Sequence, residues 1–148
     1  MADTDVRGRL IDAAKAEFLR CGYQKASLRT IAQAAGATTG AVYFCFGSKA
    51  ELFHAVVDET ADALRHLLID GAEGEDTGSV SGEDNDRAFI LCLHAHPEES
   101  LILLEKAEGS PLAGFRAEMT ALLAEGFLRF FRLACGDEED APMIDLLV

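Results

Sequence analysis

The chain has 148 residues, of which 49% are hydrophobic and 26% are charged. This length suits one domain, or a small domain with a helical companion, and this composition excludes disordered, collagen-like and disulfide-scaffold proteins. The formal net charge of −13 is uneven: residues 1–50 hold seven Lys/Arg and four Asp/Glu (+3), and residues 51–148 hold six and twenty-two (−16).

The N-terminal part of the chain is expected to be helical. Apolar residues recur at intervals of three and four and predict a helix over 7–21, which Gly22 ends. Ser27 is a good N-cap for a second helix over 28–35, which Gly36 ends. A mildly basic head on an acidic body indicates two tasks, one of which involves an anionic partner.

A third and a fourth helix follow. Thr38 or Thr39 can cap a very short helix that runs to about Cys45. The sequence from Ser48 to Glu51 is a capping box, in which each residue's side chain bonds the backbone N–H of the other, and it begins a long helix that reaches about residue 69.

The second half is read as a loop followed by more helices. Residues 71–86 are rich in Gly and acids and predict a flexible acidic loop. The helices expected beyond it are 87–95, 98–108, 112–134 and a final apolar segment over 141–148. This last segment ends without a polar cap, so we expect the natural chain to be longer.

The sequence therefore predicts an all-α protein without strands. Its predicted parts are a head (1–48), a connecting helix (49–70), the acidic loop (71–86) and a helical body (87–148). No run of about 18 apolar residues predicts a membrane span, and the acidic residues 1–5 carry no export signal. We expect a cytoplasmic protein.

Cysteine and histidine spacing offers no site. Cys21, Cys45, Cys92 and Cys135 form no CxxC pair, and residues two apart, such as His94 and His96, do not share a helix face. No nucleophile lies near a base at usable spacing. We expect no catalytic residue, no metal and no cofactor.

The helices over 28–35 and 39–45 have the dimensions of a helix-turn-helix. The second helix of such a unit enters the major groove of DNA, and Gly36 supplies the positive φ that the turn needs. Any tight helical corner shares this pattern, so the pattern alone does not identify a DNA-binding protein.

Two stretches add specificity. Residues 27–41 (SLRTIAQAAGATTGA) and 42–53 (VYFCFGSKAELF) resemble the DNA-binding head of the TetR family of bacterial transcriptional regulators. The resemblance covers about residues 6–65. It implies a repressor that binds a palindromic double-stranded DNA operator as a homodimer, with no membrane involved, and is released by a small apolar effector in the body.

The resemblance also implies site residues. Ser27 would meet a phosphate through its hydroxyl and backbone N–H, Tyr43 a phosphate or a thymine methyl, and Lys49 a phosphate. The expected DNA-binding residues are Ser27, Arg29, Thr38, Thr39, Ala41, Tyr43, Phe44 and Lys49. This chain departs from the family at two positions. Cys45 stands where the family often has His, and Gly47 stands where it often has Lys, Pro or a polar residue. A contact with DNA can therefore be altered here.

Each of these residues also has a structural interpretation. Tyr43 can be a half-buried structural aromatic, and Lys49 a solvated cation at a helix start. Thr38 and Thr39 can act as caps only, and Arg29 can be an exposed helix residue without a DNA contact.

The body offers candidate effector and dimer residues. Its apolar helices can form a bundle core, an apolar pocket, or both. The pocket residues expected are Phe89, Leu93, His94, Leu101, Leu104, Phe115 and Met119. By analogy with the family's helical dimer interface, the expected contact residues are Phe127, Phe130 and Phe131.

One alternative from another class stays open. The chain can be a small helical module whose acidic surface binds a protein partner. Such a module would show no salt-sensitive affinity for DNA.

Overall fold

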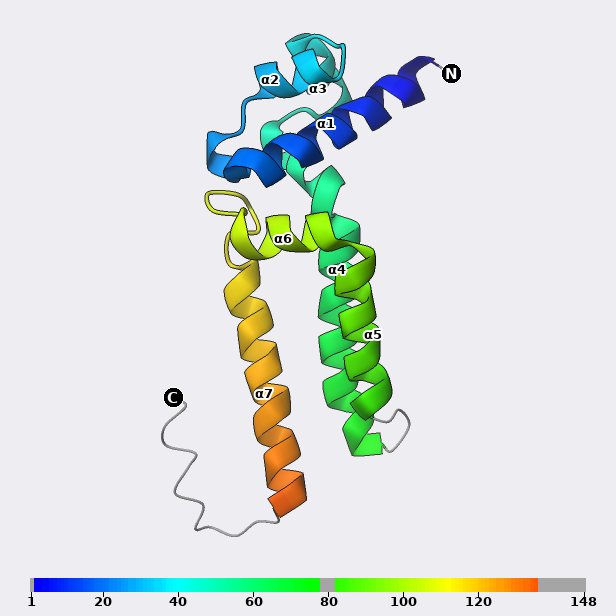
Figure 1. Ribbon diagram of the computed structural model, residues 1–148, viewed down its shortest axis with the longest axis vertical. Coiled ribbons are helices and arrows are strands. Elements are labelled where there is room, and N and C mark those ends of the chain that lie inside the picture. The colour runs from blue at the N-terminus through cyan, green and yellow to red at the C-terminus, as the bar shows by residue number, and fades with distance from the viewer. Residues whose placement is uncertain (1, 78–81, 136–148) are drawn as a thin grey trace.

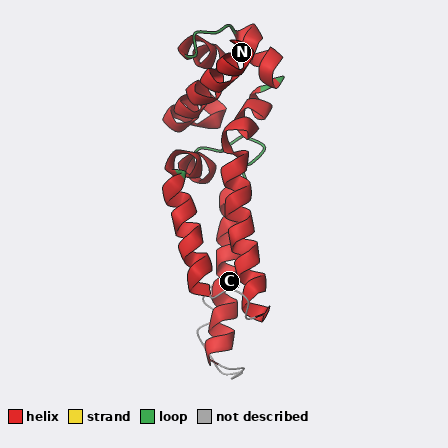
Figure 2. Cartoon of the chain, turned by 90° about the vertical axis from the view of Figure 1, so that its right-hand side faces the viewer, coloured by secondary structure: helices red, strands yellow, loops and turns green. Residues whose placement is uncertain are grey.

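The computed structural model of the protein describes residues 2–77 and 82–135, and this part of the chain forms seven helices and no strand (Figures 1 and 2). The helices are α1 (Ala2–Lys25), α2 (Leu28–Ala34), α3 (Thr39–Phe46), α4 (Lys49–Thr77), α5 (Gly82–Ala95), α6 (Pro97–Glu105) and α7 (Phe115–Cys135). The prediction of an all-α fold is confirmed.

The helices form a head at one end of an elongated body. Helices α1, α2 and α3 gather at the top of Figure 1, and α4 leads from them down the molecule with α5 beside it. Helix α6 lies between α1 and the long helices, and α7 descends from its end. Because α4 packs against α1, α5, α6 and α7, it is the element that joins head to body.

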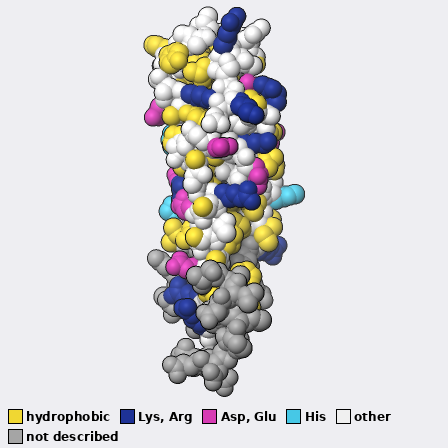
Figure 3. Space-filling view, turned by 90° about the vertical axis from the view of Figure 1, so that its left-hand side faces the viewer, with side chains coloured by type: hydrophobic (Ala, Val, Ile, Leu, Met, Phe, Trp, Pro, Cys, Tyr) yellow, Lys and Arg dark blue, Asp and Glu magenta, His cyan; other side chains and the backbone are white. Residues whose placement is uncertain are grey.

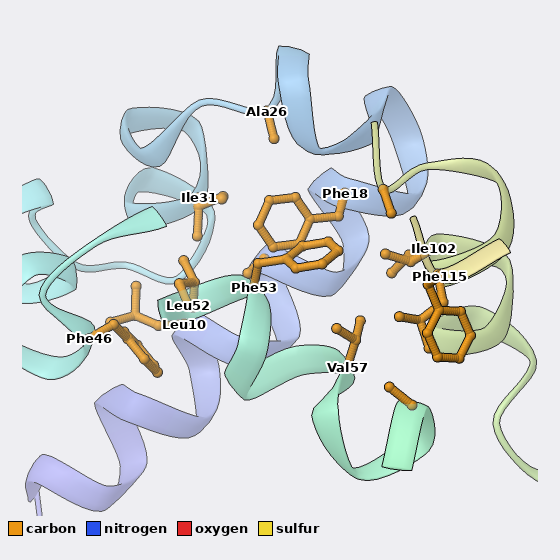
Figure 4. Packing of buried hydrophobic residues seen from close by; sticks show 14 of the residues in the cluster. Leu10, Phe18, Ala26, Ile31, Phe46, Leu52, Phe53, Val57, Ile102 and Phe115 are labelled. Atoms are coloured by element: carbon orange, nitrogen blue, oxygen red, sulfur yellow. The ribbon is translucent and has the colours of Figure 1, made fainter. Parts of the chain in front are cut away.

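One hydrophobic cluster runs from the head into the body. On α1 the fully buried residues Leu10, Ala14 and Phe18 are spaced by four, which places them on one helix face (Figure 4). Phe53 and Val57 of α4 meet that face, and the cluster continues to Phe115 of α7. Head and body are therefore packed against each other rather than tethered.

Gly22 shapes the end of α1. Its φ of 77° interrupts the helical backbone, as its identity predicted, although the chain resumes helical turns to Lys25. The Tyr23 N–H donates to the Lys106 carbonyl at 2.8 Å, and a Cβ on Gly22 would lie 3.4 Å from that same oxygen. The positive φ favours glycine here, while a Cβ would make only an ordinary contact where α1 docks against the end of α6.

The predicted acidic loop over 71–86 is wrong for most of its length. Residues 71–77 continue α4, and 82–86 begin α5. Once a helix has formed, each further residue adds a hydrogen bond at little cost, and one glycine costs only about 1 kcal/mol relative to alanine. The loop's remainder (78–81) and the predicted final segment (141–148) lie outside the described residues.

The remaining helix boundaries shift by a few residues. Helix α1 begins at Ala2 rather than at 7, and α6 ends at Glu105 rather than at 108. Helix α7 begins at Phe115 rather than at 112. Turns of the chain occupy 110–114 before α7, with the Phe115 N–H donating to the Leu112 carbonyl.

An ion pair fastens α1 to α6. The Lys15 Nζ lies 2.8 Å from the Glu99 Oε1 and 3.7 Å from the Glu98 Oε2. The hydrogen bond with Glu99 raises the pKa of Lys15 above 10.5. Burial alone would raise the pKa of Glu99, but the Lys15 hydrogen bond brings it below 4.5. The pair therefore stabilises the fold fully between pH 4.5 and pH 10.5. This contribution is lost as pH falls through the lowered pKa of Glu99 or rises through the raised pKa of Lys15.

Replacing Glu99 by glutamine is expected to lower the free energy of unfolding by about 1–2 kcal/mol at pH 7, because a half-buried, charge-assisted hydrogen bond is lost. The difference from the wild type should shrink as pH falls below 4.5. Urea unfolding of both proteins from pH 3 to 7 measures this. The control, Glu98→Gln, removes the more distant and exposed carboxylate and should cost no more than about 0.5 kcal/mol. Equal costs for the two variants would contradict this assignment.

Candidate nucleic-acid interface

The turn between α2 and α3 is set by local sequence. The Ser27 Oγ accepts from the Thr30 N–H at 3.5 Å and begins α2, and the Thr38 Oγ1 accepts from the Ala41 N–H at 3.2 Å and begins α3. Between them, Gly36 has a φ of 64°. The caps predicted at Ser27 and Thr38 are confirmed, and so is the role of Gly36 in the turn.

Buried residues fix which side of each helix faces outward. Ile31 and Ala32 hold α2 in the core, and Val42 and Phe46 hold α3. Val42 and Phe46 are four residues apart, so the opposite side of α3 carries Gly40, Tyr43 and Phe44. Tyr43 is 55% exposed and Phe44 is 80% exposed. Both rings are therefore accessible at the surface of α3.

The other predicted DNA-contact residues of this unit lie on the surface or at its edge. Ser27, Arg29 and Thr38 are exposed. Thr39 and Ala41 are half-buried. The hydroxyls of Ser27 and Thr38 serve as caps on residues that are themselves exposed.

Ser27 is more constrained than expected. Its backbone N–H hydrogen-bonds the carboxylate of Glu17, which is buried and paired with Arg20. Burial would raise the pKa of Glu17, but the bond from Arg20, assisted by Ser27, lowers it. Of the two groups expected to meet a phosphate, the hydroxyl caps α2 and the N–H is directed to Glu17.

Lys49 lies at the start of α4 and is partly held by the head. Its Nζ is 3.5 Å from the Gln24 carbonyl oxygen and 4.6 Å from the centre of the Tyr23 ring. Burial lowers the pKa of Lys49, although the nearby Cys21 and Glu17 act to raise it. One of the two bonds of the predicted capping box is confirmed: the Ser48 Oγ accepts from the Glu51 N–H at 3.1 Å. Lys49 is thus a positioned cation rather than a freely solvated one.

The sequence interpretation missed three basic residues of α1. Arg9 donates from its Nε to the Ala35 carbonyl at 3.0 Å, and it pairs with Asp5, so it anchors the end of α2. Arg7 lies over the Phe46 ring at 5.0 Å, and Lys25 is exposed just before Ser27. The excess of positive charge over 1–50 indicated such residues but could not place them. Figure 3 shows Lys and Arg side chains along the upper part of one face, over the head.

The predicted pocket residues separate in the structure. Phe115 and Met119 are buried in the main cluster, and Phe89, Leu93 and Leu104 pack against it. His94 and Leu101 are exposed instead. Among the described residues, no group of three or more His, Cys, Asp or Glu side chains is placed to hold a metal ion.

The predicted dimer residues lie on the outer side of α7. Phe127 is 65% exposed and Phe131 is 51% exposed, and their ring centres are 6.2 Å apart. The side chain of Phe130 lies outside the described residues. In the part of the chain that the structure describes, no helix is both long and apolar enough to cross a membrane.

Comparison with known proteins points to one group. Residues 10–56 match the family model described as "Bacterial regulatory proteins, tetR family". The chain is 38% identical over 72 residues to the HTH-type transcriptional regulator TtgR of Pseudomonas putida, covering 49% of this chain and 34% of that protein. It is 41% identical over 76 residues to the HTH-type nicotine-responsive transcriptional repressor HdnoR of Paenarthrobacter nicotinovorans, covering 49% and 39%. The match therefore spans well under half the length of these relatives.

The fold of most of the chain has solved counterparts. The crystal structure of NalD, the secondary repressor of the MexAB-OprM multidrug efflux pump in Pseudomonas aeruginosa, aligns with a TM-score of 0.50 and 26% identity. That alignment covers 93% of this chain and 71% of NalD. The similarity thus extends from the head into the helical body.

Proposed function

We propose, from the match of residues 10–56 to the family model of the tetR bacterial regulatory proteins, that the chain is a ligand-responsive, DNA-binding transcriptional regulator that acts as a repressor. Its partners are a palindromic double-stranded operator and a small apolar effector. It works as a homodimer in the cytoplasm, without catalysis and without a cofactor. Relatives named as transcriptional regulators and repressors support this assignment.

The observation that carries the proposal is the outward face of α3. The buried Val42 and Phe46 turn Tyr43 and Phe44 toward solvent on a short helix that follows the Gly36 turn. A short helix with an exposed face at the end of the molecule (Figure 1) is the shape that fits a major groove about 12 Å wide. Hydroxyls at the starts of α2 and α3 suit phosphate contacts.

Dimerisation and release involve the body. We propose that Phe127 and Phe131 of α7 meet their counterparts in a second copy, because exposed aromatic side chains on one helix face favour association. A two-fold dimer would set two α3 helices against half-sites roughly 34–36 Å apart. An effector bound among the apolar helices would change the spacing of the two heads of the dimer, acting through α4 and the α1–α6 contact. It can do so only if it binds one spacing of the heads more tightly than the other.

A gel-shift experiment separates the regulator from the rival interaction module. The 148-residue chain is titrated into the duplex DNA that flanks its own coding region, at several salt concentrations. A regulator gives a retarded complex whose affinity falls as salt rises. A protein-binding module gives no salt-sensitive complex with any duplex, and that result would remove the proposed function.

Replacing Lys49 by alanine is expected to weaken binding to all DNA sequences alike. Losing one phosphate contact should reduce the slope of log K against log salt by about 0.9. Filter binding or fluorescence anisotropy between about 50 and 200 mM salt measures this slope. The control is Arg116→Ala, which removes an exposed body cation paired with Glu105. An unchanged slope for the Lys49 variant would contradict its phosphate role.

A further inference from the structure

Helix α3 lacks the side chains that usually read bases. Residues 34–48 contain no Lys, Arg, Asp, Glu, Asn or Gln. Bidentate contacts from Arg or Lys to guanine, and from Asn or Gln to adenine, are therefore impossible from α3 or the turns beside it. The polar side-chain atoms available on α3 and its cap are the hydroxyls of Thr38, Thr39 and Tyr43.

The face of α3 is instead two aromatic rings flanked by glycines. Gly40 lies on the same side of α3 as Tyr43 and Phe44, and Gly36 and Gly47, just outside the two ends of the helix, are also exposed. A Cβ added at Gly36 or Gly47 would meet nothing within 4 Å. No side chain at these positions holds another molecule away, so DNA can approach the rings and the backbone closely.

Phe44 has only one kind of contact to offer. Tyr43 can direct its hydroxyl to a phosphate, whereas the phenyl ring of Phe44 has no polar atom. It is 80% exposed, so it contributes little to the core. In the major groove, the apolar group that such a ring can cover is the C5-methyl of thymine.

On the basis of the proposed function, we propose that Phe44 is a specificity-determining residue that packs on the C5-methyl of a thymine in each half-site. Operator choice then depends on thymine methyls and hydroxyl contacts rather than on charged or amide side chains. A buried methyl group is worth about a fourfold change in affinity.

The test couples the ring to the methyl. The 148-residue chain is used to enrich a site from a random duplex pool, and each thymine of that site is then replaced singly by uracil, which lacks only the methyl. Fluorescence anisotropy gives the affinity of the wild type, Phe44→Ala and Phe44→Tyr for every duplex. Ile90→Ala, which trims an exposed apolar residue (64%) of α5, is the matched control.

The expected result is one thymine per half-site whose replacement weakens wild-type binding about fourfold. Phe44→Ala should lose this sensitivity at that thymine, while Phe44→Tyr and Ile90→Ala keep it. If DNA binds but no thymine distinguishes the wild type from Phe44→Ala, the role of Phe44 is overturned and the proposed function stands. If no duplex is enriched or bound, the proposed function itself fails, and the role of Phe44 fails with it.

Discussion

Replacing Gly40 by aspartate is expected to abolish DNA binding while leaving the protein at least as stable as the wild type. Gly40 is the second residue of α3 and is exposed beside Tyr43 and Phe44. A carboxylate there would face the phosphates, and like-charge contact costs several kcal/mol, so that a cost of roughly 3 kcal/mol weakens affinity about 100-fold. Fluorescence anisotropy with an enriched duplex measures the loss.

The same substitution should not harm the helix. Negative charge in the first turn of a helix is favourable, and aspartate replaces the more flexible glycine. A Cβ at this position would lie 3.7 Å from the Thr38 Oγ1, an ordinary contact. Thermal unfolding should therefore show an unchanged or higher midpoint.

Gly40→Ala is the control for Gly40→Asp. It adds the same Cβ without charge and should stabilise the helix by about 0.5–1 kcal/mol while retaining DNA binding. If the aspartate variant bound DNA as tightly as the alanine variant, this face of α3 would not meet DNA.

Replacing Phe53 by alanine is expected to cost about 3–5 kcal/mol of the free energy of unfolding. Phe53 is fully buried where head and body meet, with its ring centre 5.2 Å from that of Phe18 and 5.0 Å from that of Tyr23, both edge-on. The variant loses both ring contacts and leaves a cavity in the one cluster that the two parts share. Urea unfolding followed by circular dichroism measures the cost.

Phe44→Ala is the matched control for Phe53→Ala. It removes the same side chain from a position that is 80% exposed and should change stability by no more than about 0.5 kcal/mol. Similar costs for the two variants would show that the packing described around Phe53 does not hold the molecule together.

The sequence predicted the head more fully than the body, because the head's signals are local. A hydroxyl one residue before α2 or α3 and a glycine in the turn determine where those helices begin and end, whatever surrounds them. The exposure of Tyr43 and Phe44 follows from the spacing of Val42 and Phe46, which four-residue periodicity makes readable.

Contacts between distant residues could not be read in this way. Lys49 is expected from the sequence to be available at a helix start, but Tyr23 and Gln24 of α1 hold it, and only the fold brings them together. The same applies to the hydrogen bond from Ser27 to Glu17. His94 and Leu101 carry apolar or aromatic character that suits a pocket, yet the packing of α5 and α6 leaves both exposed.

The composition of one segment led to a wrong prediction. Residues 71–86 combine glycine and acids in the proportions of a loop, but α4 and α5 continue into that segment from both sides. The two helices pack along each other, and tertiary packing supplies more helical stability than intrinsic propensity does.

If the chain binds DNA as proposed, α2, α3 and the start of α4 meet the duplex. Mapping which residues contact the DNA tests this. A duplex enriched from a random pool is titrated into the 15N-labelled chain, and backbone amide shifts are followed residue by residue. We expect the largest changes at residues 38–44 and at Lys49, with little change along α5. Changes confined to the body, or absent from α3 while the duplex is bound, would contradict it.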